Sequence, residues 1–260
     1  MLCLIWYGKP QTNEKQNPTS HLCIFIFGCV CHKIILAPFS TFDLIAEIRD
    51  YQTNNPVLLQ KSHHFVFDCP FKAGSISKPD YNWIGLNPGN DSPDWERTSN
   101  KNDEETRERN FQEIFGRSRS SKERMTKAER FLGTDYFHST THTKLFFWCS
   151  NGISNDFELR YGTSSDNSPH VKFCCKINKR LIERVEPKAI FFESIPKLSI
   201  LKQYFPLKLI EKYKVQTRKV DVYLLENKYK LINFDHLSAL GDTIKYRSEV
   251  SGLVQNLLTE

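Results

Sequence analysis

The chain lacks the signals that would place it in or across a membrane. The apolar run over 22–30 is short and is followed by His32 and Lys33, so it does not predict a membrane-spanning helix. A clear cluster of positive charges before this run and a clear small-residue cleavage site after it are both missing, so a secretory signal peptide is not predicted either. We expect a protein that does not bind membranes.

Cysteine is present without the spacing that metal sites need. The eight cysteines include no C-x-x-C pair, and the densest group, Cys29-Val-Cys31-His32, has no second half-site. Cys174 and Cys175 are adjacent on an expected helix and cannot easily face one metal ion. We therefore predict reduced thiols in a cytoplasmic protein, no metal site and no cofactor.

Several catalytic signatures are also missing. The sequence has no P-loop, no G-x-S-x-G nucleophile elbow and no H-E-x-x-H helix, which disfavours common nucleotide hydrolases, esterases and metalloproteases. Charge is only mildly unbalanced: 36 basic against 30 acidic residues give +6. This excess permits binding to a polyanion without requiring it. Aromatic residues, at 13%, supply a core and could also stack on bases.

The length of 260 residues suits one sizeable domain with an irregular appendage. We expect residues 1–40 to be an N-terminal extension of uncertain structure, with a buried strand pair as the alternative. Residues 41–260 would then form the single domain.

Within 41–260, segments with strand and helix patterns alternate. Apolar residues at helical spacing predict helices over 42–52, 171–185, 195–204 and 250–258, with one or two surface helices within 90–130 and a polar loop over 151–169. Short apolar or alternating runs predict strands over 64–67, 81–86, 143–148, 188–193, 219–225 and 229–234. This order predicts an α/β fold: a three-layer sandwich with a central, mostly parallel sheet flanked by helices.

The most informative segment is Trp83-Ile-Gly-Leu-Asn-Pro-Gly89, where an apolar strand enters a tight turn. Gly85 would let the backbone approach a ligand, Pro88 fixes one dihedral angle, and Gly89 can adopt a positive φ. Asn87 would then be held at the carboxyl end of a strand, where open α/β sheets bind ligands. The alternative is that Asn87 only caps a turn that reverses the chain.

A second segment, Leu231-Ile-Asn-Phe-Asp-His-Leu-Ser238, places His236 just past another strand. In a parallel sheet, Asn87 and His236 would overlook the same crevice. The alternative is that His236, beside Asp235, is only a satisfied residue at the boundary of the core.

Taken together, the two segments resemble the motifs of a known superfamily. Gly85-Leu-Asn-Pro-Gly89 is similar to the first motif of the uracil-DNA glycosylase superfamily, in its mismatch-specific and single-strand-selective branches. His236-Leu-Ser238 resembles the second motif, His-Pro-Ser. The resemblance covers roughly residue 66 to the C-terminus. It implies an enzyme of base-excision repair that flips uracil or a related damaged base out of DNA and hydrolyses its glycosidic bond.

The resemblance also implies roles for the matching residues. Asn87 would orient the water that attacks the sugar C1′, a position where some branches have aspartate. His236 would donate a hydrogen bond to O2 of the departing uracil. The turn of Gly85, Leu86, Pro88 and Gly89 would contact base or water.

Two further residues would contact the DNA. Ser238 would meet a phosphate. Trp95 would stack on the flipped base, with burial as a loop anchor as its alternative. The implied partner is DNA, single- or double-stranded, and we expect a monomer.

The chain departs from the superfamily pattern at two places. Leu237 replaces the proline of the second motif. The predicted strand over 143–148 lacks the asparagine that reads the uracil edge, and Lys144 stands near its start. The alternative function is therefore a catalytically inactive relative that binds nucleic acid or a nucleotide.

Overall fold

The computed structural model describes residues 40–61, 65–70, 78–87, 119–148, 157–215, 218–237 and 244–259. All of them belong to one compact unit that spans Pro38–Glu260. The predicted extension over 1–40 lies outside the described residues except for its last position.

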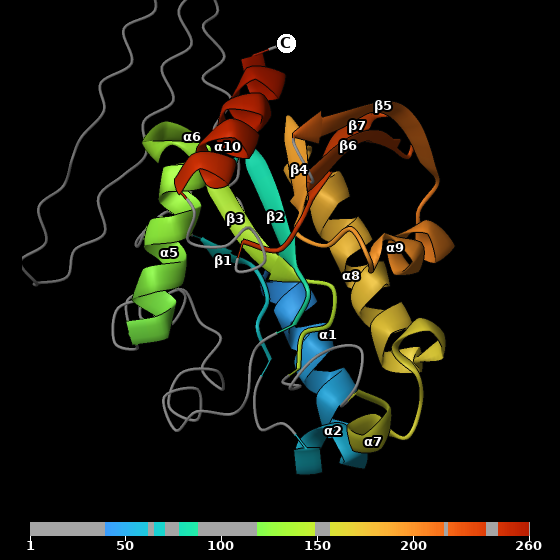
Figure 1. Cartoon of the computed structure of the whole chain (residues 1–260). Helices are drawn as coiled ribbons and strands as arrows, with labels where there is room; N and C mark the ends of the chain where they lie inside the picture. Colours follow the sequence, from blue (N-terminus) through green and yellow to red (C-terminus); the bar gives the residue numbers. More distant parts are fainter. Residues whose placement is uncertain are drawn as a thin grey trace, which may run out of the picture. The chain divides into compact units, whose positions relative to one another are not determined.

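The centre of the fold is a seven-stranded sheet with the order β1-β3-β2-β4-β7-β6-β5 (Figure 1). The neighbouring pairs β3–β2, β2–β4 and β4–β7 are parallel. β6 is antiparallel to both β7 and β5, so β5 runs in the direction of β7; β1 is antiparallel to β3. Five strands thus share one direction, as expected for a mostly parallel sheet. The strands are β1 (Cys69–Pro70), β2 (Tyr81–Gly85), β3 (Thr140–Lys144), β4 (Ala189–Phe192), β5 (Leu207–Val215), β6 (Arg218–Leu225) and β7 (Tyr229–Phe234).

Helices cover both faces of the sheet. One hydrophobic cluster contains side chains of α1, α8 and α9, and a second contains side chains of α5, α6 and α10. The three-layer α/β sandwich expected from the sequence is therefore confirmed. The helices are α1 (Phe42–Thr53), α2 (Pro56–Lys61), α5 (Arg119–Leu132), α6 (Thr134–His138), α7 (Phe157–Tyr161), α8 (Pro169–Val185), α9 (Leu198–Tyr204) and α10 (Ile244–Thr259), with a 3-10 turn η2 (Ser165–Asn167).

Helix α8 begins and ends at residues that favour those positions. The Ser168 side chain accepts a hydrogen bond from the amide of His170, and Pro169 occupies the first turn, where its missing N–H costs nothing. Glu186 ends the helix in a left-handed conformation, with φ of 49°. The helix predicted over 171–185 is confirmed and is slightly longer at its start.

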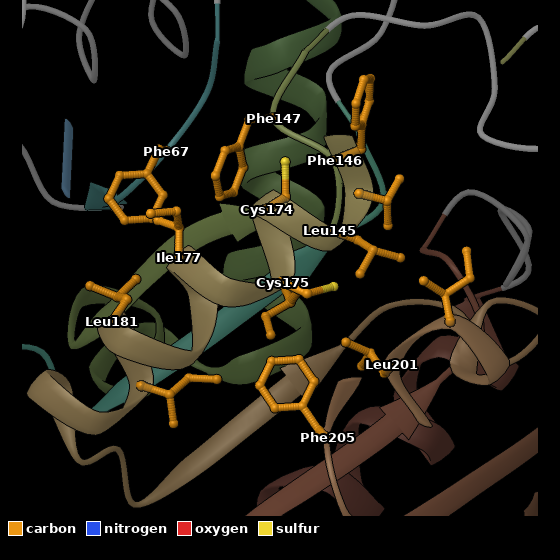
Figure 2. Packing of buried hydrophobic residues seen from close by; sticks show 14 of the residues in the cluster. Phe67, Leu145, Phe146, Phe147, Cys174, Cys175, Ile177, Leu181, Leu201 and Phe205 are labelled. Carbon is orange, nitrogen blue, oxygen red and sulfur yellow. The ribbon is translucent and has the colours of Figure 1, made fainter. Parts of the chain in front are cut away.

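Helix α8 carries two buried cysteines in the layer that it forms against the sheet. Figure 2 shows the thiols of Cys174 and Cys175 pointing in different directions among apolar side chains. Burial raises the pKa of the Cys174 thiol well above its ordinary value and also raises the pKa of Cys175. Both groups therefore stay protonated and act as small apolar side chains, because the thiolate is the form that binds metals and reacts.

The opposite face is built around aromatic rings. Trp83 of β2 meets Phe234 of β7 edge to face, with ring centroids 5.5 Å apart, and Phe131 of α5 lies 4.8 Å from Phe234. These contacts fix the carboxyl ends of β2 and β7 against one helical layer.

Four sequence-based assignments are wrong in detail. In place of the strand predicted over 64–67, the described residues 65–67 contain only an isolated antiparallel bridge from Phe65 to Trp148. β3 covers 140–144 instead of 143–148, because the four residues Thr140–Thr143 are buried and pair with β2, whereas Phe147 accepts a hydrogen bond from the Val66 amide. The loop predicted over 151–169 contains α7 and η2. β5 was not predicted at all, since it is a largely exposed edge strand without a clear apolar alternation.

None of the helices among the described residues combines the length and apolar composition that a membrane-spanning segment requires.

Candidate active site at the carboxyl edge of the sheet

The candidate site lies where the inner parallel strands end. The chain leaves β2 toward β3 on one side, and leaves β4 toward β5, beyond β7, on the other. Open α/β sheets bind ligands at the carboxyl edge where connections diverge in this way. Lys144 of β3 lies beside Gly85 of β2, and the amide of Glu193, just past β4, donates to the Ile84 carbonyl at 3.2 Å. Lys144, Gly85 and Glu193 thus mark the ends of three neighbouring strands.

Gly85 lies where a larger side chain would not fit. A Cβ at this position would be 2.9 Å from Nζ of Lys144 and 3.1 Å from Nε2 of His142. Both of these basic side chains are buried, and alternate residues of a strand share one face. The space that a side chain would take at position 85 is therefore occupied by Lys144 and His142. A larger residue there would force Nζ of Lys144, the far end of a flexible side chain, to move.

Backbone contacts fix the segment that leads to Asn87. The amides of Leu145 and Phe146 donate to the carbonyls of Gly85 and Leu86, at 2.7 and 2.9 Å. From the α8 layer, Nδ2 of the buried Asn178 donates to the Lys144 carbonyl at 2.8 Å. Asn87 itself is half-buried, two residues past β2. It is therefore held at the sheet edge as the sequence predicted.

Glu193 is the most unusual residue of this edge. Its side chain has 0% exposure. Oε2 accepts a hydrogen bond from Nε1 of Trp83 at 3.0 Å, and Oε1 accepts one from the amide of Leu237 at 2.9 Å. A buried carboxylate needs such partners, because an uncompensated charge away from water is strongly destabilising. Glu193 thus ties the end of β4 to β2 and to the segment after β7.

His236 faces the same carboxylate. Its Nε2 lies 3.4 Å from Oε1 of Glu193, and 35% of its side chain remains exposed. The neighbouring Asp235 instead pairs with Nη1 of Arg218, at 3.3 Å. Glu193, and not the adjacent Asp235, thus lies opposite Nε2 of His236. The ring contacts this buried carboxylate and is also accessible from solvent.

The structure brings Asn87 and His236 to one edge, as the two motifs predicted. Asn87 follows β2 and His236 follows β7, and β4 separates these two strands. Adjacent strands lie about 4.8 Å apart, so the two backbones are separated by roughly 10 Å.

The other predicted site residues are less well placed by the structure. Leu86 is half-buried and packs against the core on the α8 face. Pro88, Gly89, Trp95 and Ser238 lie outside the described residues.

Sequence reasoning missed Glu193. It ends a strand predicted over 188–193, and an acidic residue at a strand end gives no signal of burial. Only the pairing of β4 between β2 and β7 shows that its carboxylate lies under His236. Within the part of the chain that the structure describes, no group of three or more His, Cys, Asp or Glu side chains could hold a metal ion.

No protein-family model matches the chain, and no curated protein matches it.

Proposed function

We propose that this protein is a monomeric DNA glycosylase that hydrolyses the N-glycosidic bond of a flipped-out uracil or related damaged base. The observation that carries the proposal is the position of Asn87 and His236 at the ends of β2 and β7, on either side of β4. This edge is the ligand-binding side of an open α/β sheet. The similarity of both segments to the uracil-DNA glycosylase motifs supports the same assignment.

In the proposed reaction, the C1′–N bond breaks and its electron pair leaves with the base. The oxygen of a water molecule held by Asn87 forms the new bond to C1′. The proton that this water loses passes through solvent to the base anion, which is released as the neutral base. Asn87 orients this water without removing a proton, since an amide is not a base. His236 donates a hydrogen bond to the base oxygen on which negative charge develops, and a prepositioned donor of this kind stabilises the transition state. Water is the second substrate, and the proposed reaction requires no cofactor.

The test is cleavage of labelled oligonucleotides, single- and double-stranded, that carry one uracil, followed by alkali to break abasic sites. We expect strand breaks with the wild-type protein. Asn87→Ala and His236→Ala should each lower the rate by about 10²–10³-fold, the loss expected for one transition-state contact. Asn87→Asp should retain activity, because aspartate occupies this position in some branches of the superfamily.

Matched controls come from the described surface. Asn256 on α10 is exposed, and His138 of α6 is a partly exposed histidine remote from the sheet edge. Asn256→Ala and His138→Ala should cleave at the wild-type rate. Full activity in both Asn87→Ala and His236→Ala would contradict the proposal.

A second candidate function is binding to nucleic acid or a nucleotide without catalysis. The observation that favours it is Lys144, a buried cation at the end of β3 in the region where the superfamily carries a base-reading asparagine. Retarded migration of the oligonucleotide on a native gel, without abasic sites, would support this alternative.

The described thiols support a cytoplasmic location for the enzyme. Cys69, Cys174 and Cys175 are all buried free thiols. Free thiols persist where the cell keeps cysteine reduced.

A further inference from the structure

The buried carboxylate of Glu193 determines which form of His236 the site can hold. Glu193 accepts hydrogen bonds from Trp83 and from the Leu237 amide, and such bonds favour the ionised form of a carboxylate. Protonation of Glu193 would weaken these bonds, because a neutral carboxyl oxygen accepts a hydrogen bond less strongly than a carboxylate oxygen does. An ionised carboxylate with no exposure requires a positive charge close by. The imidazole of His236, 3.4 Å from Oε1, can supply that charge by binding a proton.

The two ring nitrogens of His236 then have different tasks. Nε2 lies within ion-pair distance of Oε1 of Glu193, so the negative carboxylate favours a proton on Nε2. A neutral ring in this tautomer has a bare Nδ1, which can only accept a hydrogen bond. An imidazolium has N–H groups on both nitrogens and can donate to Glu193 and to a ligand at the same time.

We propose that Glu193 is a positioning residue that keeps His236 as an imidazolium, so that Nδ1–H can donate to an anionic leaving base. The identity of that acceptor rests on the proposed glycosylase function; the charge state of the ring does not. This arrangement selects for substrates whose leaving group develops negative charge on an oxygen, as uracil does. A charge-assisted hydrogen bond is roughly twice as strong as one between neutral groups.

Leu237 provides an independent observation for the same arrangement. Its amide donates to Oε1 of Glu193 at 2.9 Å, and its side chain is buried. Proline, which follows the histidine in the superfamily motif, has no N–H and could not make this bond. The replacement of the motif proline by Leu237 and the burial of Glu193 are therefore linked. The residue after His236 must have an amide N–H, because that N–H donates to the Glu193 carboxylate.

Other charged groups near the ring come from neighbouring strands. Asp235, next to His236, is paired with Arg218 of β6. Lys144 and His142 of β3 lie over Gly85, in the strand beyond β2. A positive charge on Lys144 would oppose protonation of His236, whereas Glu193 favours it at 3.4 Å. The experiment must therefore measure the ring itself.

The decisive measurement is the protonation of the His236 ring in the wild-type protein, followed by ¹H–¹⁵N NMR from about pH 5 to 9. Both ring nitrogens should remain protonated at pH 7, and the titration midpoint should fall in Glu193→Gln. A neutral His236 ring at pH 7 in the wild-type protein would overturn the proposal, whatever the variant does. An unchanged midpoint in a folded Glu193→Gln protein would overturn it as well.

One internal control accompanies the titration. His170 is buried in the α8 layer, where desolvation lowers its pKa, and its titration should be unaffected by Glu193→Gln.

Turnover separates this proposal from the glycosylase assignment. Glu193→Gln should lower kcat by about 10²-fold with little change in KM, because the lost interaction belongs to the transition state. The wild-type kcat should fall as pH rises through the His236 midpoint. If the wild-type protein cleaves no base, the function fails while the NMR result still stands. If it cleaves with a neutral His236 ring, the positioning role of Glu193 fails and the function stands.

Discussion

At the scale of single residues, the space over Gly85 shows how closely this edge is packed. A Cβ there would lie 2.9 Å from Nζ of Lys144, the end of a flexible but buried side chain. Gly85→Ala should therefore lower the free energy of unfolding by about 1–3 kcal/mol through overpacking. The Gly85→Ala/Lys144→Ala double variant should recover part of that loss, since the clashing amine is gone.

Urea denaturation of the wild-type protein, both single variants and the double variant measures this coupling. Strict additivity of the two substitutions would show that Lys144 does not determine the need for glycine at position 85.

A second residue-scale prediction concerns the amide of Leu237. Leu237→Pro removes the N–H that donates to Glu193 and should destabilise the protein by about 1–3 kcal/mol more than Leu237→Ala, which keeps it. In a Glu193→Leu background the difference between proline and alanine at 237 should shrink, because the acceptor is gone. Urea denaturation of these variants gives the coupling energy, and an unchanged difference would exclude the hydrogen bond as its cause.

Among single residues, the sequence allowed the positions of Asn87 and His236 to be predicted, because strand ends followed by turn residues leave a local pattern. It did not reveal Glu193. Burial of a carboxylate depends on strands that are distant in the sequence, β2, β4 and β7, lying side by side. The close approach of Lys144 to Gly85 was not predicted for the same reason, because Lys144 reaches Gly85 from another strand.

At the scale of elements, α1 is fastened to α8 by charged side chains. Nη1 and Nη2 of Arg184 donate to the two carboxylate oxygens of Asp43, at 2.6 and 2.8 Å. Arg180 pairs with Glu47 one turn further along α1. The hydrogen bonds from Arg184 are the main reason that the pKa of Asp43 falls to about 2. This bidentate contact should stabilise the folded protein only where Asp43 is ionised.

The pH dependence follows from the direction of that shift. The pKa of Asp43 is lower in the folded state than its ordinary value of 3.8, so its contribution is complete above about pH 4 and is lost as the pH falls toward 2. More than half of the side chain is exposed, so solvent screening limits the effect of Asp43→Asn to about 0.5–1 kcal/mol at pH 7.

Urea unfolding at pH 7 and pH 3 measures the difference between wild type and Asp43→Asn, which should shrink at the lower pH. Asp80→Asn removes a more exposed, single contact with Lys188 and should change stability less. If Asp43→Asn lowered the free energy of unfolding more at pH 3 than at pH 7, the stabilising contact between ionised Asp43 and Arg184 would be contradicted.

Sequence patterns were sufficient for elements whose burial is regular. The apolar spacing of α1 and α8, and the runs of β2, β4, β6 and β7, allowed all six to be predicted near their observed positions. The strand corresponding to β3 was predicted too far along the chain, because its buried threonines count as polar in a hydrophobic pattern. Threonine is β-branched, however, and suits a strand. β5 was missed because an exposed edge strand has little apolar signal.

At the scale of the whole molecule, one sheet separates two hydrophobic layers. Phe191 packs in the α5–α10 layer and Phe192 in the α1–α8 layer, although the two residues are adjacent on β4. Phe191→Ala and Phe192→Ala should each lower the free energy of unfolding by about 3–5 kcal/mol. Since both layers share β4, each variant should still unfold in a single transition.

Calorimetry and far-UV circular dichroism on both variants check this expectation. Two separate transitions in either variant would mean that the layers unfold independently. The fold class itself could be predicted from sequence because strands and helices alternate along the chain, and that order favours a parallel sheet covered on both faces.

The inner position of β7 has a consequence for the motions of the site. β7 is paired with β4 on one side and β6 on the other, so the strand that precedes His236 has no open edge. Its amides can exchange with deuterium only when several strands separate together, an opening close in free energy to global unfolding. The imidazole therefore follows a strand whose amides should be among the slowest to exchange in the chain. Adaptation to different substrates must then come from the segments that follow the strands, while the frame beneath His236 stays fixed.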